Sequence, residues 1–220
     1  MELTYRTVLF DLDGTVFESG EGIMRTAVET MAEFSWPVPP PETLRRFVGP
    51  PSHESYEHLA GMPRELAQRA AVAHRARYLR GNWRLARMYP GMRELLSDLR
   101  AAGARLAVAS TKPRPAMEAM MEEFSLWDAF DAFSCGNADG TGGEKPVLIA
   151  KSLAALGEDD KSRAVMVGDT RFDAAGARDA GVPFIGALYG YGTREELEKN
   201  GASVFAESVE GLRPLLFRGI

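Results

Sequence analysis

The stretch that decides the fold is residues 7–15, TVLFDLDGT, in which an apolar run ends at two carboxylates. Thr7 to Phe10 has the character of a short buried strand, and Asp11 and Asp13 follow it, one residue apart. Side chains two residues apart on an extended backbone point to the same side, so these two carboxylates repel each other unless a cation or a shared proton compensates. The stretch therefore predicts a strand that ends at a metal site or at a proton-sharing pair.

The composition indicates a protein with a substantial buried core. The chain has 220 residues, of which 45% are hydrophobic and 26% are charged. Its formal net charge of −5 does not suggest a surface for nucleic acid polymers. Cys135 is the only cysteine, which argues against a disulfide framework and a thiolate zinc site. The first residues lack the order of a signal peptide and no apolar run is long enough for a membrane, so we expect a cytoplasmic protein with no membrane partner.

Three further apolar runs resemble the first, at residues 105–109, 164–167 and 183–188. Amphipathic helical stretches at 92–102 and 146–156 separate them, and each stretch ends at a glycine. Apolar strands that alternate with such helices predict an α/β fold, with a Rossmann-like parallel sheet covered on both faces. Right-handed crossovers would then bring the C-terminal ends of the strands to one edge, where ligands bind.

Residues 18–89 follow a different, helical periodicity and carry no strand signal. We predict one apolar helix face made by Ile23, Ala27, Thr30, Met31 and Phe34, and another made by Leu66, Ala70, Ala73 and Ala76. The three histidines fall in this region without a metal-binding spacing and are expected to be surface or packing residues. The predicted organisation is a core domain of residues 1–17 and 90–220 with an all-helical domain of residues 18–89 inserted.

Polar side chains follow the first three predicted strands, where the strands would converge. They are Asp11, Asp13 and Thr15 after the first, Ser110, Thr111 and Lys112 after the second, and Asp169 and Asp173 after the third, with Lys145 ahead of the third. On a parallel sheet these groups would meet at one edge.

Phosphoryl transfer through an aspartyl phosphate is the chemistry that needs this set. Asp11 is the expected nucleophile, and Asp13 would give a proton to the leaving oxygen and later take one from water. Ser110 would donate to the phosphoryl oxygens and Lys145 would offset their charge. Asp169 and Asp173 complete a set of oxygen ligands that suits Mg²⁺.

Each residue taken alone has a simpler interpretation. Asp-rich turns are common caps, Ser110 could cap a helix, and Lys145 could be a solvated side chain. Lys151 competes with Lys145 for the same role. The joint order and spacing favour the catalytic interpretation.

The set of motifs resembles the haloacid dehalogenase superfamily, in its phosphatase branch. The motifs are Asp11-Leu12-Asp13-Gly14-Thr15, Ser110, Lys145 and Gly168-Asp169 with Asp173, and the segments at 46–51 and 184–202 are similar to phosphoglycolate-phosphatase-like members.

The resemblance implies an Mg²⁺-dependent phosphomonoesterase with a C1-type helical cap, acting on a small phosphorylated metabolite. It implies metal ligands at Asp11, Asp13, Asp169 and Asp173. It also implies substrate contacts from Thr15, Thr111, Arg46 and Gly49.

Other activities occur on the same fold, so the site residues must decide between them. A dehalogenase would not need Asp13, because a halide leaves unprotonated. A 5′-nucleotidase of the same family and a phosphosugar mutase remain as alternatives, since both would use the same motifs. A non-catalytic binding module is disfavoured because every expected catalytic position is filled.

Overall fold

Strand β2 (Thr7–Phe10) lies inside a parallel sheet and is fully buried. In the computed structural model, which describes residues 2–219, strands β5 (Arg105–Pro113) and β7 (Ala164–Gly168) flank it on either side. The sheet has six parallel strands in the order β6-β5-β2-β7-β8-β9. The remaining strands are β6 (Ala132–Gly136), β8 (Phe184–Ala187) and β9 (Phe205–Ala206). The predicted α/β fold is confirmed.

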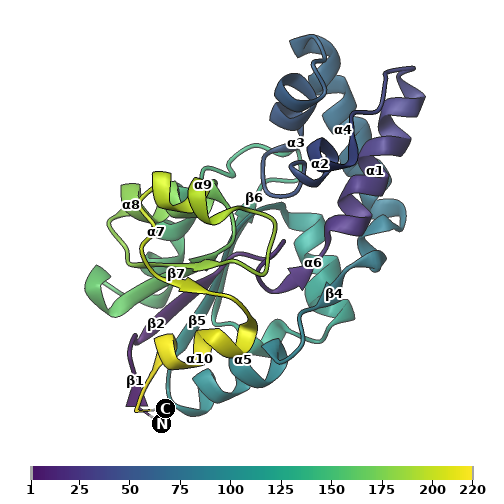
Figure 1. Cartoon of the computed structure of the whole chain (residues 1–220). Helices are drawn as coiled ribbons and strands as arrows, with labels where there is room; N and C mark the ends of the chain where they lie inside the picture. The colour runs from purple at the N-terminus through teal and green to yellow at the C-terminus, as the bar shows by residue number, and fades with distance from the viewer. Residues whose placement is uncertain (1, 220) are drawn as a thin grey trace.

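Helices cover both faces of this sheet because successive residues of β2 face opposite sides (Figure 1). Val8 and Phe10 belong to an apolar cluster with α5 (Met92–Ala101), α6 (Arg114–Glu123) and α10 (Val209–Leu216). Leu9 belongs to a second cluster on the other face. That cluster is shared with α7 (Lys145–Leu156) and α8 (Arg171–Ala180).

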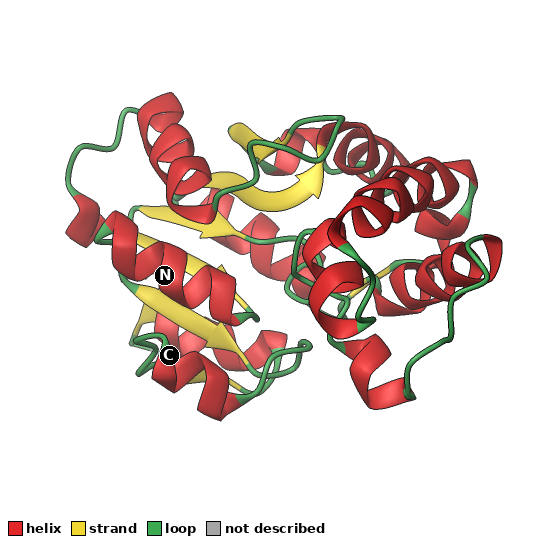
Figure 2. Ribbon diagram, turned by 90° about the horizontal axis from the view of Figure 1, so that it is seen from above, coloured by secondary structure: helices red, strands yellow, loops and turns green. Residues whose placement is uncertain are grey.

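The inserted residues form a group of helices at one end of the molecule (Figures 1 and 2). The two chain segments that lead into and out of this group pair as the antiparallel strands β3 (Phe17–Glu18) and β4 (Arg87–Met88). The group consists of α1 (Gly20–Glu33), α2 (Pro41–Arg45), α3 (Ser52–Glu54), a π-helical turn at Ser55–Leu59, α4 (Arg64–Arg80) and a 3₁₀ turn at Asn82–Leu85. These helices surround an apolar cluster of their own, which includes Met31, Phe47 and Tyr56.

Short elements complete the chain. They are the antiparallel pair β1 (Glu2–Leu3) and β10 (Phe217–Arg218), 3₁₀ turns at Trp127–Ala129 and Lys161–Arg163, and α9 (Arg194–Lys199). None of the helices within residues 2–219 has both the length and the apolar character that crossing a membrane requires. The division into domains at residues 17 and 90 stays a prediction.

Two details of the sequence interpretation were wrong. Strands β6 and β9 were not predicted, because β6 is the short sequence AFSCG without a β-branched residue and β9 has only two residues. The second expected helix face was also misplaced, since Ala76 is exposed whereas Ala67 and Ala71 are buried. Two polar side chains, His74 and Tyr78, extend the buried face of α4, and a search for apolar residues alone passes over them.

His74 is a packing residue inside the helical group. Its Nδ1 lies 2.9 Å from the Tyr56 hydroxyl, and its ring stacks on Tyr78. Burial, reinforced by the nearby charges of Arg75, Lys112 and Arg77, lowers the pKa of His74 to about 3. The folded protein therefore holds this imidazole in its neutral form.

We expect His74 to make folding less favourable in mild acid. In the unfolded chain the imidazole of His74 takes up a proton near pH 6.5, whereas in the folded chain it stays neutral. The protein therefore loses stability as the pH falls below that value. The free energy of unfolding should be about 2 kcal/mol lower at pH 5 than at pH 7.5 from this group. Urea unfolding of the wild type and of His74→Gln across this pH range measures it. Equal pH dependence in the two proteins would contradict the assignment.

Candidate active site

The turn after β2 brings its carboxylates to the edge of the sheet. The Asp11 amide donates to the Val167 carbonyl of β7, which continues the strand pairing to the first carboxylate. The chain then turns back, and the Leu12 carbonyl accepts hydrogen bonds from the amides of Thr15, Val16 and Phe17. Gly14 has a φ of 91° in this turn, a left-handed conformation that favours glycine.

Lys145, the first residue of α7, lies between two carboxylates. Its Nζ is 2.7 Å from Asp11 Oδ1 and 2.6 Å from Asp173 Oδ1, and it also donates to the Ala109 carbonyl. Burial alone would lower the pKa of Lys145, but Asp11 and Asp173 outweigh it and raise the pKa. Lys151, in contrast, is exposed on the same helix.

Asp169 follows β7 and is fully buried. Its Oδ2 accepts a hydrogen bond from the Tyr191 amide at 2.8 Å, and its Oδ1 accepts one from the Thr15 hydroxyl at 3.2 Å. Glycines 14 and 190 permit this close approach, because a Cβ would lie 2.1 Å from Asp169 Oδ2 at Gly14 and 2.3 Å from Asp169 Cβ at Gly190.

Three carboxylates converge here, each with one oxygen within 4.8 Å of the others: Asp11, Asp169 and Asp173. Desolvation raises the pKa of Asp11 to about 6 even though Lys145 opposes the shift, and the charge of Asp173 adds to it. Burial, together with the charges of Asp173 and Asp11, also raises the pKa of Asp169 well above its ordinary value. Crowded anions of this kind are what a divalent cation would stabilise.

Asp13 points to a different cation. Its two carboxylate oxygens lie 2.8 and 2.9 Å from Nζ of Lys112, and the Tyr78 hydroxyl lies 3.1 Å from the same nitrogen. The side chain of Lys112 is only 2% exposed. Asp13 is therefore not among the three clustered carboxylates, and in this geometry only its main chain would be left to serve a metal.

Ser110 and Thr111 lie within strand β5 and not after it, because the strand continues past residue 109 to Pro113. The pairing of β5 with β6 shifts register between Ser110 and Pro113. Ser110 is buried, and its hydroxyl accepts from the Lys112 amide at 3.3 Å. The Thr111 hydroxyl donates to the Gly49 carbonyl at 3.3 Å, so it links the sheet to the inserted helices.

A cleft of about 750 Å³ opens between the sheet edge and the helical group. Its wall includes the catalytic candidates Asp13 and Lys145, together with Lys112, Gly49 and Thr111. Side chains of the helical group contribute Phe47, His53, Arg75 and Tyr78. This volume is within the range of small-molecule binding sites.

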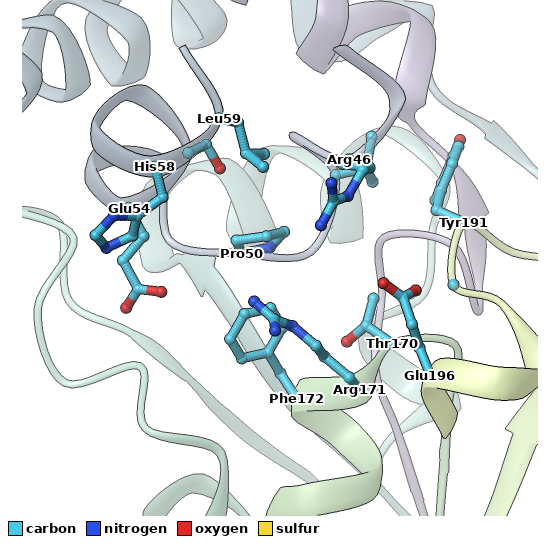
Figure 3. Close-up of a pocket in the computed structure, with 13 residues that line it drawn as sticks. Arg46, Pro50, Glu54, His58, Leu59, Thr170, Arg171, Phe172, Tyr191 and Glu196 are labelled. Atoms are coloured by element: carbon cyan, nitrogen blue, oxygen red, sulfur yellow. The ribbon is translucent and has the colours of Figure 1, made fainter. Parts of the chain in front are cut away.

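Arg46 lies elsewhere. It lines a smaller hollow of about 70 Å³, next to the cleft, with Pro50, Thr170, Arg171 and Tyr191 (Figure 3). Figure 3 shows Arg46 entering this hollow from the inserted segment and Arg171 from α8 on the opposite side. The structure thus brings Gly49 and Thr111 to the cleft beside Asp13 but does not bring Arg46 there.

Comparison with known protein families identifies the family of this chain. Residues 8–187 match the family described as haloacid dehalogenase-like hydrolase. The chain belongs to this family. The resemblance predicted from the sequence motifs is confirmed.

Several relatives of this haloacid dehalogenase-like hydrolase cover nearly the whole chain. Tyrosine-protein kinase PtkA of Mycobacterium tuberculosis is 35% identical over 95% of this chain and 72% of its own length. Phosphoglycolate phosphatase of Caulobacter vibrioides is 35% identical over 94% of this chain and 89% of its own. The crystal structure of a predicted phosphatase from Clostridium acetobutylicum superposes with a TM-score of 0.88 at 34% identity, covering 94% of this chain and 96% of that one.

The residues present fit a magnesium ion, as expected of this family. Asp11, Asp169 and Asp173 supply hard oxygen ligands, which Mg²⁺ prefers. Within residues 2–219, the ion pairs made by these carboxylates and by Asp13 are with the ammonium groups of Lys112 and Lys145. A divalent cation would compensate for the excess of carboxyl groups over ammonium groups.

Sequence reasoning missed the role of three residues at this site. Lys112 was noted after the second strand but assigned no partner, although its position two residues after Ser110 was a usable signal. Tyr78 gave no signal, because it reaches the site from a distant part of the chain. Tyr191 lies in the segment 184–202 that contributes to the family resemblance, but it was assigned no role.

We expect Asp169→Asn to weaken Mg²⁺ binding at least about tenfold, because it removes one anionic ligand from the cluster. Calorimetric titration of the protein with MgCl₂ measures the change, and Asp128→Asn, an exposed residue, is the matched control. Unchanged Mg²⁺ affinity in Asp169→Asn would contradict the assignment.

Proposed function

We propose that this chain is an Mg²⁺-dependent phosphomonoester hydrolase that works through an aspartyl phosphate. The observation that carries the proposal is the buried Lys145 bridging Asp11 and Asp173 beside Asp169, with a second carboxylate, Asp13, at the cleft. A nucleophile, a proton-transfer group and a cation site then lie together at one sheet edge.

In the first step, an Asp11 oxygen forms a bond to the phosphorus atom as the bond from phosphorus to the leaving oxygen breaks. Asp13 enters this step as the protonated acid and supplies the proton that this oxygen needs. In the second step a water oxygen attacks the same phosphorus, its proton passes to Asp13, and the bond from phosphorus to Asp11 breaks. Inorganic phosphate leaves, and both carboxyl groups return to their starting states.

The supporting groups stabilise charge. In this proposal Lys145 offsets the charge on the phosphoryl oxygens and the Ser110 hydroxyl donates a hydrogen bond to them. A bound Mg²⁺ would shield the anionic substrate from the carboxylates and stabilise charge on the transferring group. Thr15, Thr111 and Gly49 are proposed to contact the substrate, and Arg46 is proposed to do so only after a shift of the inserted segment.

The proposed substrate is a small phosphorylated metabolite, with phosphoglycolate as the first candidate. The sequence relative from Caulobacter is named for this substrate, and it covers most of the chain. A 5′-nucleotide is the second candidate, because the cleft of about 750 Å³ leaves room for a larger leaving group. The rates of phosphate release from phosphoglycolate and from a 5′-nucleotide, each measured with Mg²⁺ and with a chelator, show which is the better substrate.

Product analysis separates the other activities. A phosphosugar mutase would return an isomeric sugar phosphate instead of free phosphate. The name of the PtkA relative adds protein tyrosine phosphorylation as another candidate activity. That reaction would move the γ-phosphoryl group of a nucleoside triphosphate to a tyrosine. Inorganic phosphate as the main product supports the proposal, and an isomer or a phosphotyrosine as the main product would replace it.

We expect Asp11→Asn to lower phosphate release by roughly a thousandfold or more, because the neutral amide is a poor nucleophile. The fold should persist, and thermal unfolding checks it. Mass spectrometry must show that the asparagine has not deamidated. Turnover at the wild-type rate by intact Asp11→Asn would refute the mechanism.

We expect Lys145→Met to lower kcat by roughly 100-fold or more, because it removes the cation that faces the nucleophile. Lys151→Met is the matched control, since Lys151 lies on the same helix and is exposed. Steady-state phosphate release gives both values. If the Lys151 variant lost activity and the Lys145 variant kept it, the two roles would be exchanged.

A further inference from the structure

Lys112 is a buried cation that the mechanism above does not use. Its Nζ contacts three oxygen atoms, the two of the Asp13 carboxylate and the Tyr78 hydroxyl, at 2.8, 2.9 and 3.1 Å. An ammonium group has three hydrogens to donate, so these three oxygens can take all of them. Contacts to both carboxylate oxygens hold the plane and direction of the Asp13 side chain.

Tyr78 brings this pair into contact with the inserted helices. It lies near the end of α4, is 6% exposed, and presents its ring to Nζ of Lys112 at 4.7 Å from the centroid. His74, one turn earlier on α4, stacks on the Tyr78 ring, and Tyr56 holds His74. The Tyr78 hydroxyl is therefore fixed by packing within the helical group.

The location of Lys112 argues for a role in the reaction over one in folding. A lysine in a buried site must be compensated, and here its carboxylate partner is the proposed proton-transfer group. All three side chains line the cleft where substrate would bind. Proton transfer depends on placing Asp13 within hydrogen-bond reach of the leaving oxygen in the first step and of the attacking water in the second, so a group that fixes Asp13 affects both rates directly.

We propose that Lys112 is a positioning residue that orients the Asp13 carboxylate, and that Tyr78 makes this orientation depend on the position of helix α4. The inference rests on the proposed function, because it assigns Lys112 a role only through Asp13. It predicts that the effect of losing Lys112 requires an aspartate at position 13.

A double-mutant cycle with p-nitrophenyl phosphate tests this dependence. Its leaving group departs without a proton, so Asp13→Asn retains measurable turnover, and kcat then reports on the second step, in which Asp13 takes a proton from the attacking water. Lys112→Met should lower kcat about 30-fold in the wild-type background and change KM less than about twofold. In the Asp13→Asn background the same substitution should change kcat by less than about twofold. An equal loss in both backgrounds, or a rise in KM with kcat unchanged, would overturn the proposal.

Tyr78→Phe provides a second variant that preserves the ring and removes only the hydroxyl. We expect a loss in kcat of about threefold with aspartate at position 13 and none with asparagine there. Tyr5→Phe is the matched control, because Tyr5 is not among the residues that line the cleft. Should Lys112→Met fail to fold, the Tyr78→Phe cycle decides. An equal loss from Tyr78→Phe in both backgrounds would overturn the proposal.

The same measurements separate this inference from the proposed function. If the wild type with Mg²⁺ released no p-nitrophenol, or if Asp13→Asn were as active as the wild type, the proposed function would fail. If those results are as expected and the two cycles are additive, only the role of Lys112 fails.

Discussion

The bridge from Lys145 to Asp11 and Asp173 is the interaction on which the site depends. Its three charged groups are buried, and each loses its hydration on folding, so each is tolerated only because the others are in place. The bridge also constrains the surrounding helices. Helices α7 and α8 must pack closely for it to form, and Gly176 of α8 permits this, because a Cβ there would lie 2.5 Å from Cγ of Lys145. The nucleophile, strand β7 and both helices are therefore held in one arrangement.

Charge in the site is divided between two lysines with separate tasks. Lys145 faces the cluster of Asp11, Asp169 and Asp173, which suits a metal ion, whereas Lys112 takes Asp13 out of that cluster. The repulsion that the first stretch of sequence implies is thus relieved by a different cation for each carboxylate. This division fits the two roles that a phosphoryl-transfer reaction requires, a nucleophile and a proton-transfer group.

Contacts between the inserted helices and the core of the protein also involve Asp169 of the carboxylate cluster. Arg45 of α2 donates to the Gly190 carbonyl at 3.0 Å and lies over the ring of Tyr191. The Tyr191 hydroxyl accepts from the amide of Gly20, where α1 begins, and its own amide donates to Asp169. The segment around Tyr191 therefore touches the entry to the helical group and a proposed metal ligand together. A shift of the helical group would therefore change the surroundings of Asp169 through Tyr191 and those of Asp13 through Tyr78 and Lys112.

The sequence alone determined the α/β class, the strand that ends at Asp11, and the set of residues at neighbouring strand ends, because these follow from local periodicity and the geometry of parallel sheets. Only the tertiary structure decided which partner each charge has. Lys145, and not Lys151, lies beside Asp11, Asp13 pairs with Lys112, and Arg46 lines a smaller hollow next to the cleft. Such choices depend on contacts between residues as far apart as Asp11 and Lys145, 134 positions along the chain, and no local pattern encodes them.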